Sequence, residues 1–270
     1  MTALYITLTC LLGICVGSFL NVVIYRLPNN MSLVRPASHC PKCNYQLKWS
    51  DNVPLLSYIL LGGKCRNCKE KIYFRYPFVE VLNMVLWFLC LLCFTNVVIP
   101  TIEPNYVKFV VSCLMCSTLI CVFFCDYDNM EIPDTFQAIL LFLGLVSIFS
   151  NDIAPTERAI GFFVGFGFFA LILGLYYLVR KKEGLGFGDI KLMACLGLII
   201  GVWKTILTIV ISSVVGAVVL LILNAVKKGE KDREYPFAVF IVPAALLALF
   251  IGDIIIKWYQ SIFFSFFYCI

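Results

Sequence analysis

The feature that most constrains this chain is a series of eight long apolar runs separated by short polar segments. The runs cover residues 4–24, 77–99, 106–125, 135–150, 159–179, 190–202, 205–226 and 236–256. A transmembrane helix needs about 20 predominantly apolar residues. Because 61% of the residues are hydrophobic and only 14% are charged, the chain is also far more apolar than a soluble domain. The sequence therefore predicts an all-α polytopic membrane protein with about eight transmembrane helices.

The first run, residues 4–24, is followed by Arg26 rather than preceded by a basic stretch. This charge order is opposite to that of a cleavable signal peptide, so residues 1–25 are predicted to form the first transmembrane helix. The run at 190–202 is too short to cross a bilayer comfortably at about 1.5 Å per residue. It is expected to be tilted, held in a thinned membrane, or re-entrant.

The basic residues predict the orientation of the chain in the membrane. With the N-terminus outside, the cytoplasmic side holds nine Lys and Arg residues in the segment 26–76, four in 180–191 and four in 227–233. Only four are then left outside: Lys108, Arg158, Lys204 and Lys257. Cytoplasmic loops carry such an excess of basic residues. The net charge of +5 is thereby explained by topology, and no nucleic-acid partner is predicted.

Four of the 14 cysteines stand in the polar segment 26–76 as two C-x2-C pairs, Cys40/Cys43 and Cys65/Cys68. Both pairs are followed at the same offsets by an aliphatic and an aromatic residue, which indicates an internal repeat. Four thiolates complete the tetrahedral shell of Zn²⁺, so the predicted zinc is structural rather than catalytic. Redox chemistry is the alternative. Because no expected external loop carries a cysteine, a disulfide framework is not predicted.

The hexapeptide GFGDIK, residues 186–191, places the carboxylate of Asp189 at the boundary between two apolar runs. Ionisable groups at membrane depth are rare and usually functional. The two glycines allow a sharp turn and a close approach of another segment. They leave Asp189 at a helix start, where free N–H groups favour an anion. The alternative is that Asp189 merely N-caps the next helix.

A second acidic break, residues 125–134, falls on the same predicted cytoplasmic face. Asp126 directly follows an apolar run and is therefore expected to lie deepest. Asp128 and Glu131 are expected to be solvated loop carboxylates. Asp134 follows a proline and precedes an apolar run, so it is expected to N-cap the next helix.

Two carboxylates at matched depth on different helices, Asp126 and Asp189, suit acid–base hydrolysis of a peptide bond. At close range they cannot both ionise, so one serves as base toward water while the other protonates the carbonyl. The single histidine, His39, lies beside the cysteines, which argues against a Ser-His-Asp triad near the carboxylates. The chain also lacks the His-Glu-x-x-His motif of zinc hydrolases.

Several motifs, in the same order along the chain, resemble those of the type IV prepilin peptidase family. The segment 17–28, GSFLNVVIYRLP, is similar to the opening motif of that family. The cysteine pairs, with residues 51–58 between them and 75–80 after them, resemble its cysteine domain. Residues 126–134 resemble its first aspartate motif, and residues 186–191 its G-x-G-D motif.

This resemblance implies that Asp126 and Asp189 are the catalytic pair of a membrane aspartyl endopeptidase. The implied substrates are type IV prepilins or pseudopilins, cut after a glycine at the cytoplasmic face of the bacterial inner membrane. The resemblance also implies N-methylation of the new N-terminus with S-adenosyl-L-methionine. It associates Glu80 with the methyltransferase region, whereas pairing with Arg75 at the membrane edge is the alternative.

The expected domains are the first helix (1–25), a zinc-binding, methyltransferase-associated segment (26–76), the aspartyl peptidase domain (77–256) and an apolar tail (257–270). Two other functions stay open. One is an intramembrane aspartyl peptidase without methyltransferase activity, since no glycine-rich nucleotide loop marks a cofactor site. The other is a transporter with a zinc-ribbon loop, which would need polar residues at the centre of its spans. The expected partners are the prepilin or pseudopilin substrate and the lipid bilayer.

Overall fold

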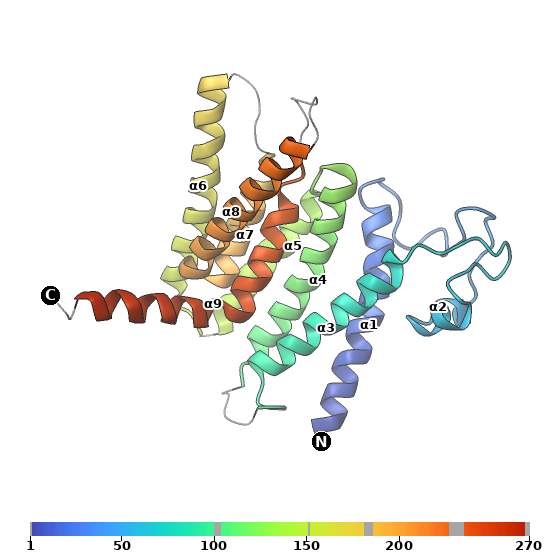
Figure 1. Ribbon diagram of the computed structural model, residues 1–270. Helices are drawn as coiled ribbons and strands as arrows, with labels where there is room; N and C mark the ends of the chain where they lie inside the picture. The colour runs from blue at the N-terminus through green and yellow to red at the C-terminus, as the bar shows by residue number, and fades with distance from the viewer. Residues whose placement is uncertain (1, 100–103, 151, 181–185, 227–234, 268–270) are drawn as a thin grey trace. The chain divides into compact units, whose positions relative to one another are not determined.

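The computed structural model describes residues 2–99, 104–150, 152–180, 186–226 and 235–267. Within these ranges the regular structure is helical, as predicted (Figure 1). The α-helices are α1 (Thr2–Arg26), α2 (Leu56–Leu60), α3 (Arg75–Phe94), α4 (Tyr106–Asn129), α5 (Asp134–Ser147), α6 (Pro155–Arg180), α7 (Phe187–Ile200), α8 (Val202–Val226) and α9 (Ala238–Phe267). Two 3₁₀ turns are η1 (Trp49–Asp51) and η2 (Ile148–Ser150).

All eight apolar runs form helices, but they differ in length. Within the described residues, six helices are long and apolar enough to cross a membrane: α1, α3, α4, α6, α8 and α9. Helices α5 and α7 have 14 residues each. At about 1.5 Å per residue they extend roughly 21 Å, which is less than the hydrocarbon thickness of a bilayer.

The chain forms two compact units, Met1–Cys121 and Val122–Ile270. The first unit is built on the packing of α1 against α3. A Cβ atom added at Gly13 would lie 2.9 Å from the Cα atom of Met84, and one at Gly17 would lie 2.8 Å from that of Glu80. The helices approach this closely because both positions lack a side chain.

Polar side chains inside the first unit form hydrogen bonds with one another and with the main chain. The amide nitrogen of Asn83 donates to the main-chain oxygen of Gly13 at 2.7 Å. Ser117 Oγ donates to Asn83 Oδ1 at 2.7 Å, and Trp87 Nε1 donates to Ser117 Oγ at 2.9 Å. This network links α1, α3 and the first part of α4.

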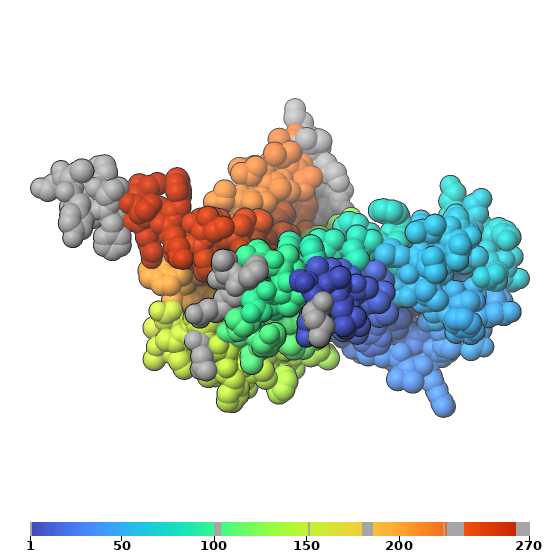
Figure 2. Space-filling view, turned by 90° about the horizontal axis from the view of Figure 1, so that it is seen from below, coloured from blue at the N-terminus to red at the C-terminus, as the bar shows by residue number. Residues whose placement is uncertain are grey.

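The segment 26–76 also belongs to the first unit. In Figure 2 its light-blue residues gather into one mass beside the darker blue of α1. Arg26, at the end of α1, is buried and donates to the main-chain oxygens of Ser32 and Pro36 at 3.0 and 2.7 Å. The guanidinium thereby fixes the start of the segment to the helix.

Helix α7 is the centre of the second unit, and ten of its 14 residues are buried. It packs against α5, α6 and α8. A Cβ atom added at Gly161 of α6 would lie 2.5 Å from the main-chain oxygen of Gly197 in α7. The close packing of α6 against α7 therefore depends on glycine at these two positions.

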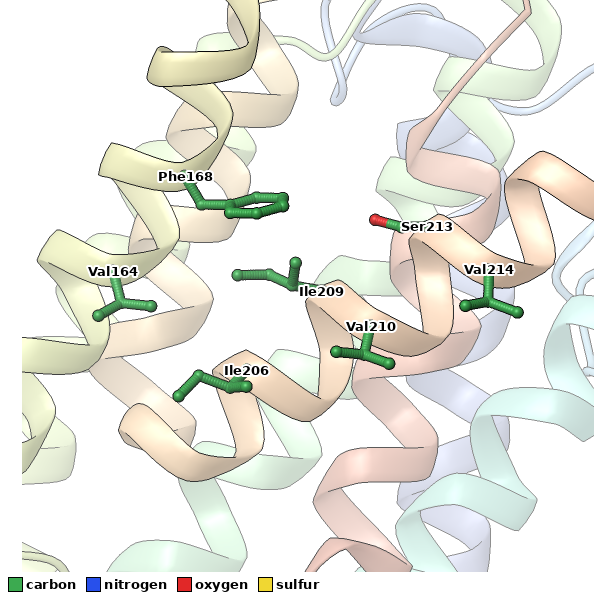
Figure 3. Close-up of a pocket in the computed structure, with 7 residues that line it drawn as sticks. All are labelled: Val164, Phe168, Ile206, Ile209, Val210, Ser213 and Val214. Carbon is green, nitrogen blue, oxygen red and sulfur yellow. The ribbon is translucent and has the colours of Figure 1, made fainter.

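The outer faces of α6 and α8 are strongly apolar. Between them lies an open groove of about 380 Å³ lined by Val164, Phe168, Ile206, Ile209, Val210, Ser213 and Val214, and Phe168 extends across it toward α8 (Figure 3). Exposed leucine and valine side chains continue along both helices beyond the groove. Such surfaces suit contact with lipid chains.

Helix α9 continues to Phe267, beyond the expected end of the last run at residue 256. Residues 257–267 of the expected apolar tail are therefore helical and continue α9. Figure 1 shows the final part of α9, in the darkest red, turned away from the direction of the earlier part.

Candidate active site and zinc site

Asp126 lies in the last turns of α4 and is 5% exposed. Its carboxylate accepts hydrogen bonds from the main-chain N–H groups of Ala238 and Val239, the first two residues of α9. The free N–H groups and the dipole of a helix N-terminus stabilise a negative charge. The second carboxylate oxygen, Oδ2, is buried and has no hydrogen-bond partner among the described residues.

Asp189 is the third residue of α7 and is 6% exposed. It lies close enough to Asp126 for the two carboxylates to interact electrostatically. Its Oδ1 atom is buried and also lacks a partner within the described part of the chain. The N-cap residue of α7 is Gly186, so the alternative that Asp189 only caps the helix is wrong.

The two glycines beside Asp189 allow close approaches at the start of α7. A Cβ atom added at Gly188 would lie 3.3 Å from the Cβ atom of Ile132, in the turn before α5. One added at Gly186 would lie 3.4 Å from Asp189 Oδ2. A side chain at position 188 would therefore press against Ile132, whereas one at position 186 would be in ordinary contact with the carboxylate.

Helix α5 holds the start of α7 through polar contacts. Asp134 forms an ion pair with Lys191 at 2.8 Å. Gln137 donates from Nε2 to the main-chain oxygen of Gly188 at 3.2 Å. The N-cap of α5 is Pro133, with no side-chain cap, so the prediction that Asp134 caps this helix is wrong. The reason is that Lys191, 57 residues later in the chain, lies within reach of its carboxylate.

Asp128 and Glu131 are exposed, in agreement with their predicted place at the surface. Asp128 is in the last turn of α4, and Met130, with φ of +56°, ends the helix. The acidic segment is thus partly helical, and Asp126 is the carboxylate in it that is buried.

The four cysteines of the segment 26–76 come together in space. Their sulfur atoms all lie within 4.8 Å of one another, with Cys40 and Cys68 3.8 Å apart and Cys43 and Cys65 4.0 Å apart. Sulfur atoms bound about 2.3 Å from one tetrahedral zinc ion lie roughly 3.8 Å apart. The spacing of the four sulfur atoms is therefore close to that of a tetrahedral zinc site.

The internal repeat predicted from the sequence is visible in the backbone. The main-chain N–H of Cys40 donates to the oxygen of Tyr45 at 2.9 Å, and that of Cys65 donates to the oxygen of Glu70 at 2.8 Å. Each turn also closes with an isolated β-bridge, His39 with Gln46 and Lys64 with Lys71. The two C-x2-C pairs thus lie in equivalent turns with the same hydrogen-bond pattern.

Main-chain N–H groups in these turns lower the pKa values of two of the thiols. The N–H of Tyr45, together with side-chain hydrogen bonds, lowers the pKa of the Cys43 thiol to about 6, whereas desolvation and the neighbouring thiols raise the pKa of the Cys68 thiol to about 12. The N–H groups of Cys68 and Asn67 lower the pKa of the Cys65 thiol. Thiolates are the form of cysteine that binds zinc.

Glu80 lies in α3 and is 7% exposed. Its Oε2 atom accepts a hydrogen bond from the main-chain N–H of Leu55 at 2.8 Å, and Ser18 donates a further side-chain hydrogen bond. Leu55 has φ of +59°, a left-handed conformation that is strained for leucine. Glu80 thereby joins α1, α3 and the segment between the two cysteine pairs.

The sequence does not predict the burial of Gln137 and Arg158. Gln137 is an isolated amide within the run 135–150, and a polar residue in an apolar span is the signal that marks it. Arg158 was placed among the outside bases, yet it is only 1% exposed. It donates to Ser147 and Ser150 at 2.8 Å and to the main-chain oxygen of Ile199 at 2.6 Å.

Sequence comparison places these residues within known domains. Residues 11–94 match the Bacterial Peptidase A24 N-terminal domain, and residues 113–221 match the Type IV leader peptidase family. A prepilin leader peptidase/N-methyltransferase of Aeromonas salmonicida is 32% identical over 96% of this chain and 94% of its own length. The chain belongs to the type IV leader peptidase family.

Other members of the family are similar to nearly the same extent. Proteins of the same name from Pseudomonas aeruginosa and Neisseria gonorrhoeae are 34% and 32% identical, over 94% and 86% of this chain and 93% and 85% of their own lengths. No solved structure matches the chain significantly. Asp126 and Asp189 lie within the region that matches the leader peptidase family, whereas the four cysteines and Glu80 lie within the N-terminal domain match.

Proposed function

We propose that this chain is a membrane aspartyl endopeptidase that removes the leader peptide of type IV prepilins or pseudopilins and then N-methylates the new N-terminal residue. The observation that carries the peptidase proposal is the pair of buried, interacting carboxylates of Asp126 and Asp189. Each keeps one buried oxygen atom without a partner among the described residues, so each is able to take part in proton transfer.

The surroundings of the two carboxylates assign their roles. Asp126 faces the N-terminal N–H groups of α9, which stabilise its ionised form. We therefore assign Asp126 as the base that accepts a proton from the attacking water. Asp189 holds the shared proton and donates it to the oxygen of the scissile carbonyl as the water adds to the carbon. The resulting tetrahedral intermediate collapses when Asp126 gives its proton to the leaving amine and the C–N bond breaks, while Asp189 takes back a proton from a hydroxyl group of the intermediate.

The zinc assignment follows from the cysteine geometry. Cys40, Cys43, Cys65 and Cys68 would hold one zinc ion, which supplies a structural cross-link and leaves no open coordination position. We assign methyl transfer, with S-adenosyl-L-methionine as methyl donor, to the segment 26–76 and the adjoining part of α3. Glu80 supports this segment by fixing the strained backbone at Leu55.

The distribution of charge supports the proposed location. We place the chain in the bacterial inner membrane with its N-terminus outside and with Asp126 and Asp189 at the cytoplasmic face. The basic residues of 26–76 would then lie in the cytoplasm. The lipid bilayer and the prepilin or pseudopilin are the proposed partners, and no nucleic acid is among them.

The proposal is tested by incubating the purified protein in detergent with a tagged prepilin and S-adenosyl-L-methionine labelled in its methyl group. We expect a shortened prepilin whose new N-terminus carries the label. Cleavage without label would support a peptidase that lacks methyltransferase activity. An intact prepilin would contradict the proposed function.

A further inference from the structure

Gln137 of α5 is buried, at 5% exposure, and its side-chain amide contacts the main chain beside Asp189. The contact is the 3.2 Å hydrogen bond to the oxygen of Gly188. Because that oxygen can only accept, the amide nitrogen must face it. The amide oxygen, Oε1, is buried as well and has no hydrogen-bond partner among the described residues.

A buried acceptor without a donor is costly, and few occur in a folded protein. Among the side chains of the described residues, three oxygen atoms are of this kind: Gln137 Oε1, Asp126 Oδ2 and Asp189 Oδ1. All three belong to the carboxylate pair or to the side chain that holds the residue before Asp189. One shared proton on the carboxylates supplies one donor, so acceptors remain in excess.

The excess of buried hydrogen-bond acceptors indicates that a hydrogen-bond donor enters the site together with the reactants. We propose that Gln137 is a third polar residue of the peptidase site, whose amide oxygen accepts a hydrogen bond from an N–H or O–H group brought in for hydrolysis. That group is a main-chain N–H of the peptide substrate or the attacking water. This inference rests on the proposed peptidase function.

The two halves of the amide then have separate tasks. The nitrogen fixes the Gly188 carbonyl and with it the start of α7, while the oxygen binds the incoming donor. A residue needed only to join α5 to α7 would use the nitrogen alone. The oxygen is therefore the part of Gln137 that distinguishes a site residue from a packing residue.

The test uses three variants of the full chain. Gln137→Met keeps the length of the side chain and removes both hydrogen bonds. Gln137→Glu resembles the amide when it is protonated, but adds a negative charge near Asp189 when it ionises. Thr135→Val is the matched control, because Thr135 is an exposed polar residue on the same helix. Zinc content and the thermal unfolding midpoint report on folding.

We expect Gln137→Met to cleave prepilin about tenfold more slowly or worse, with the unfolding midpoint and zinc content unchanged. Gln137→Glu is expected to be most active at a lower pH than the wild type, because only its protonated form presents both a donor and an uncharged acceptor. Thr135→Val should cleave at the wild-type rate.

A set of substrates, each with one main-chain N–H near the cleavage site replaced by an ester oxygen, identifies the donor. If the peptide is the donor, one ester slows the wild type about tenfold and has little effect on Gln137→Met. If water is the donor, every ester affects the two enzymes equally, and Gln137→Met lowers kcat without raising KM.

The inference is overturned if Gln137→Met cleaves like the wild type, or if it loses cleavage only together with thermal stability while Gln137→Glu keeps the wild-type pH profile. Cleavage by the wild type is measured in the same assay. A wild type that does not cleave contradicts the proposed function itself, whereas an active wild type beside an unaffected Gln137→Met contradicts this inference alone.

Discussion

Arg158, in the first turn of α6, donates a hydrogen bond from Nη1 to the main-chain oxygen of Ile199, in the last turn of α7, at 2.6 Å. The last carbonyl groups of a helix have no partner within the helix, and a positive charge near them is favourable. The guanidinium also binds Ser147 and Ser150, at the end of α5 and in η2. One side chain therefore holds the ends of three neighbouring elements, which allows the short helix α7 to end inside the protein.

Arg158→Met is expected to destabilise the second unit by about 3 kcal/mol or more, because several buried acceptors lose their donor at once. The midpoint of thermal unfolding in detergent would measure the effect. Lys257→Met, which removes an exposed base, is the matched control and should leave the midpoint unchanged. An unchanged midpoint for Arg158→Met would show that this side chain does not secure α7.

Asp126→Asn and Asp189→Asn should each lower leader cleavage by about 10²–10⁴-fold, since each removes one half of the proton-sharing pair. Insertion into the membrane should be unaffected. Cleavage rates of purified variants, normalised to the amount inserted, provide the measurement. If either variant kept its activity, that residue would have no part in the mechanism, and Asp128 would be the next candidate at the α4 position.

Asp128→Asn and Glu131→Gln should keep most of the cleavage activity, because both carboxylates are exposed at the end of α4 and in the turn after it. The same cleavage assay compares them with Asp126→Asn, two and five residues earlier in the same segment. A loss as deep as that of Asp126→Asn would show that the buried carboxylate is not the reactive one.

The purified chain should contain one zinc ion, bound by the four clustered thiols. Cys40→Ser should release the metal and expose the segment 26–76 to protease, because a small segment without a large core depends on its metal for folding. Metal analysis and limited proteolysis would show this. Cys90→Ser, in α3, is the control that should retain zinc. A metal-free wild type with a protease-resistant segment would instead indicate redox or packing roles.

The sequence predicted the helices and the zinc turns well because both depend on local patterns. Apolar runs must become helices when they cross a membrane, since every backbone polar group needs an internal partner there. The two C-x2-C turns carry their own hydrogen-bond pattern, so Cys40 and Cys65 adopt the same local structure. The burial of Asp126 followed from its place directly after an apolar run.

The contacts between helices were not predictable in the same way. Asp134 was expected to cap its own helix, but it pairs with Lys191, which is remote in the sequence. Gln137 and Arg158 have roles that depend on which carbonyl of α7 faces them. Helical periodicity defines the faces of each helix, but it does not determine which residues of two helices meet.

We propose that the carboxylate pair cleaves the leader, whereas methyl transfer belongs to the segment 26–76 and α3. The two compact units of the chain divide these residues in the same way, with Glu80 and the cysteines in the first and both aspartates in the second. Cys65→Ser and Glu80→Gln are therefore expected to impair methyl transfer more than cleavage.

The most direct test supplies a synthetic, already mature pilin peptide and labelled S-adenosyl-L-methionine to Asp189→Asn, with the wild type beside it. The account predicts that Asp189→Asn fails to cleave prepilin but methylates the mature peptide at a rate close to that of the wild type. If the wild type methylates this peptide and Asp189→Asn does not, the two activities share one site and the account is contradicted.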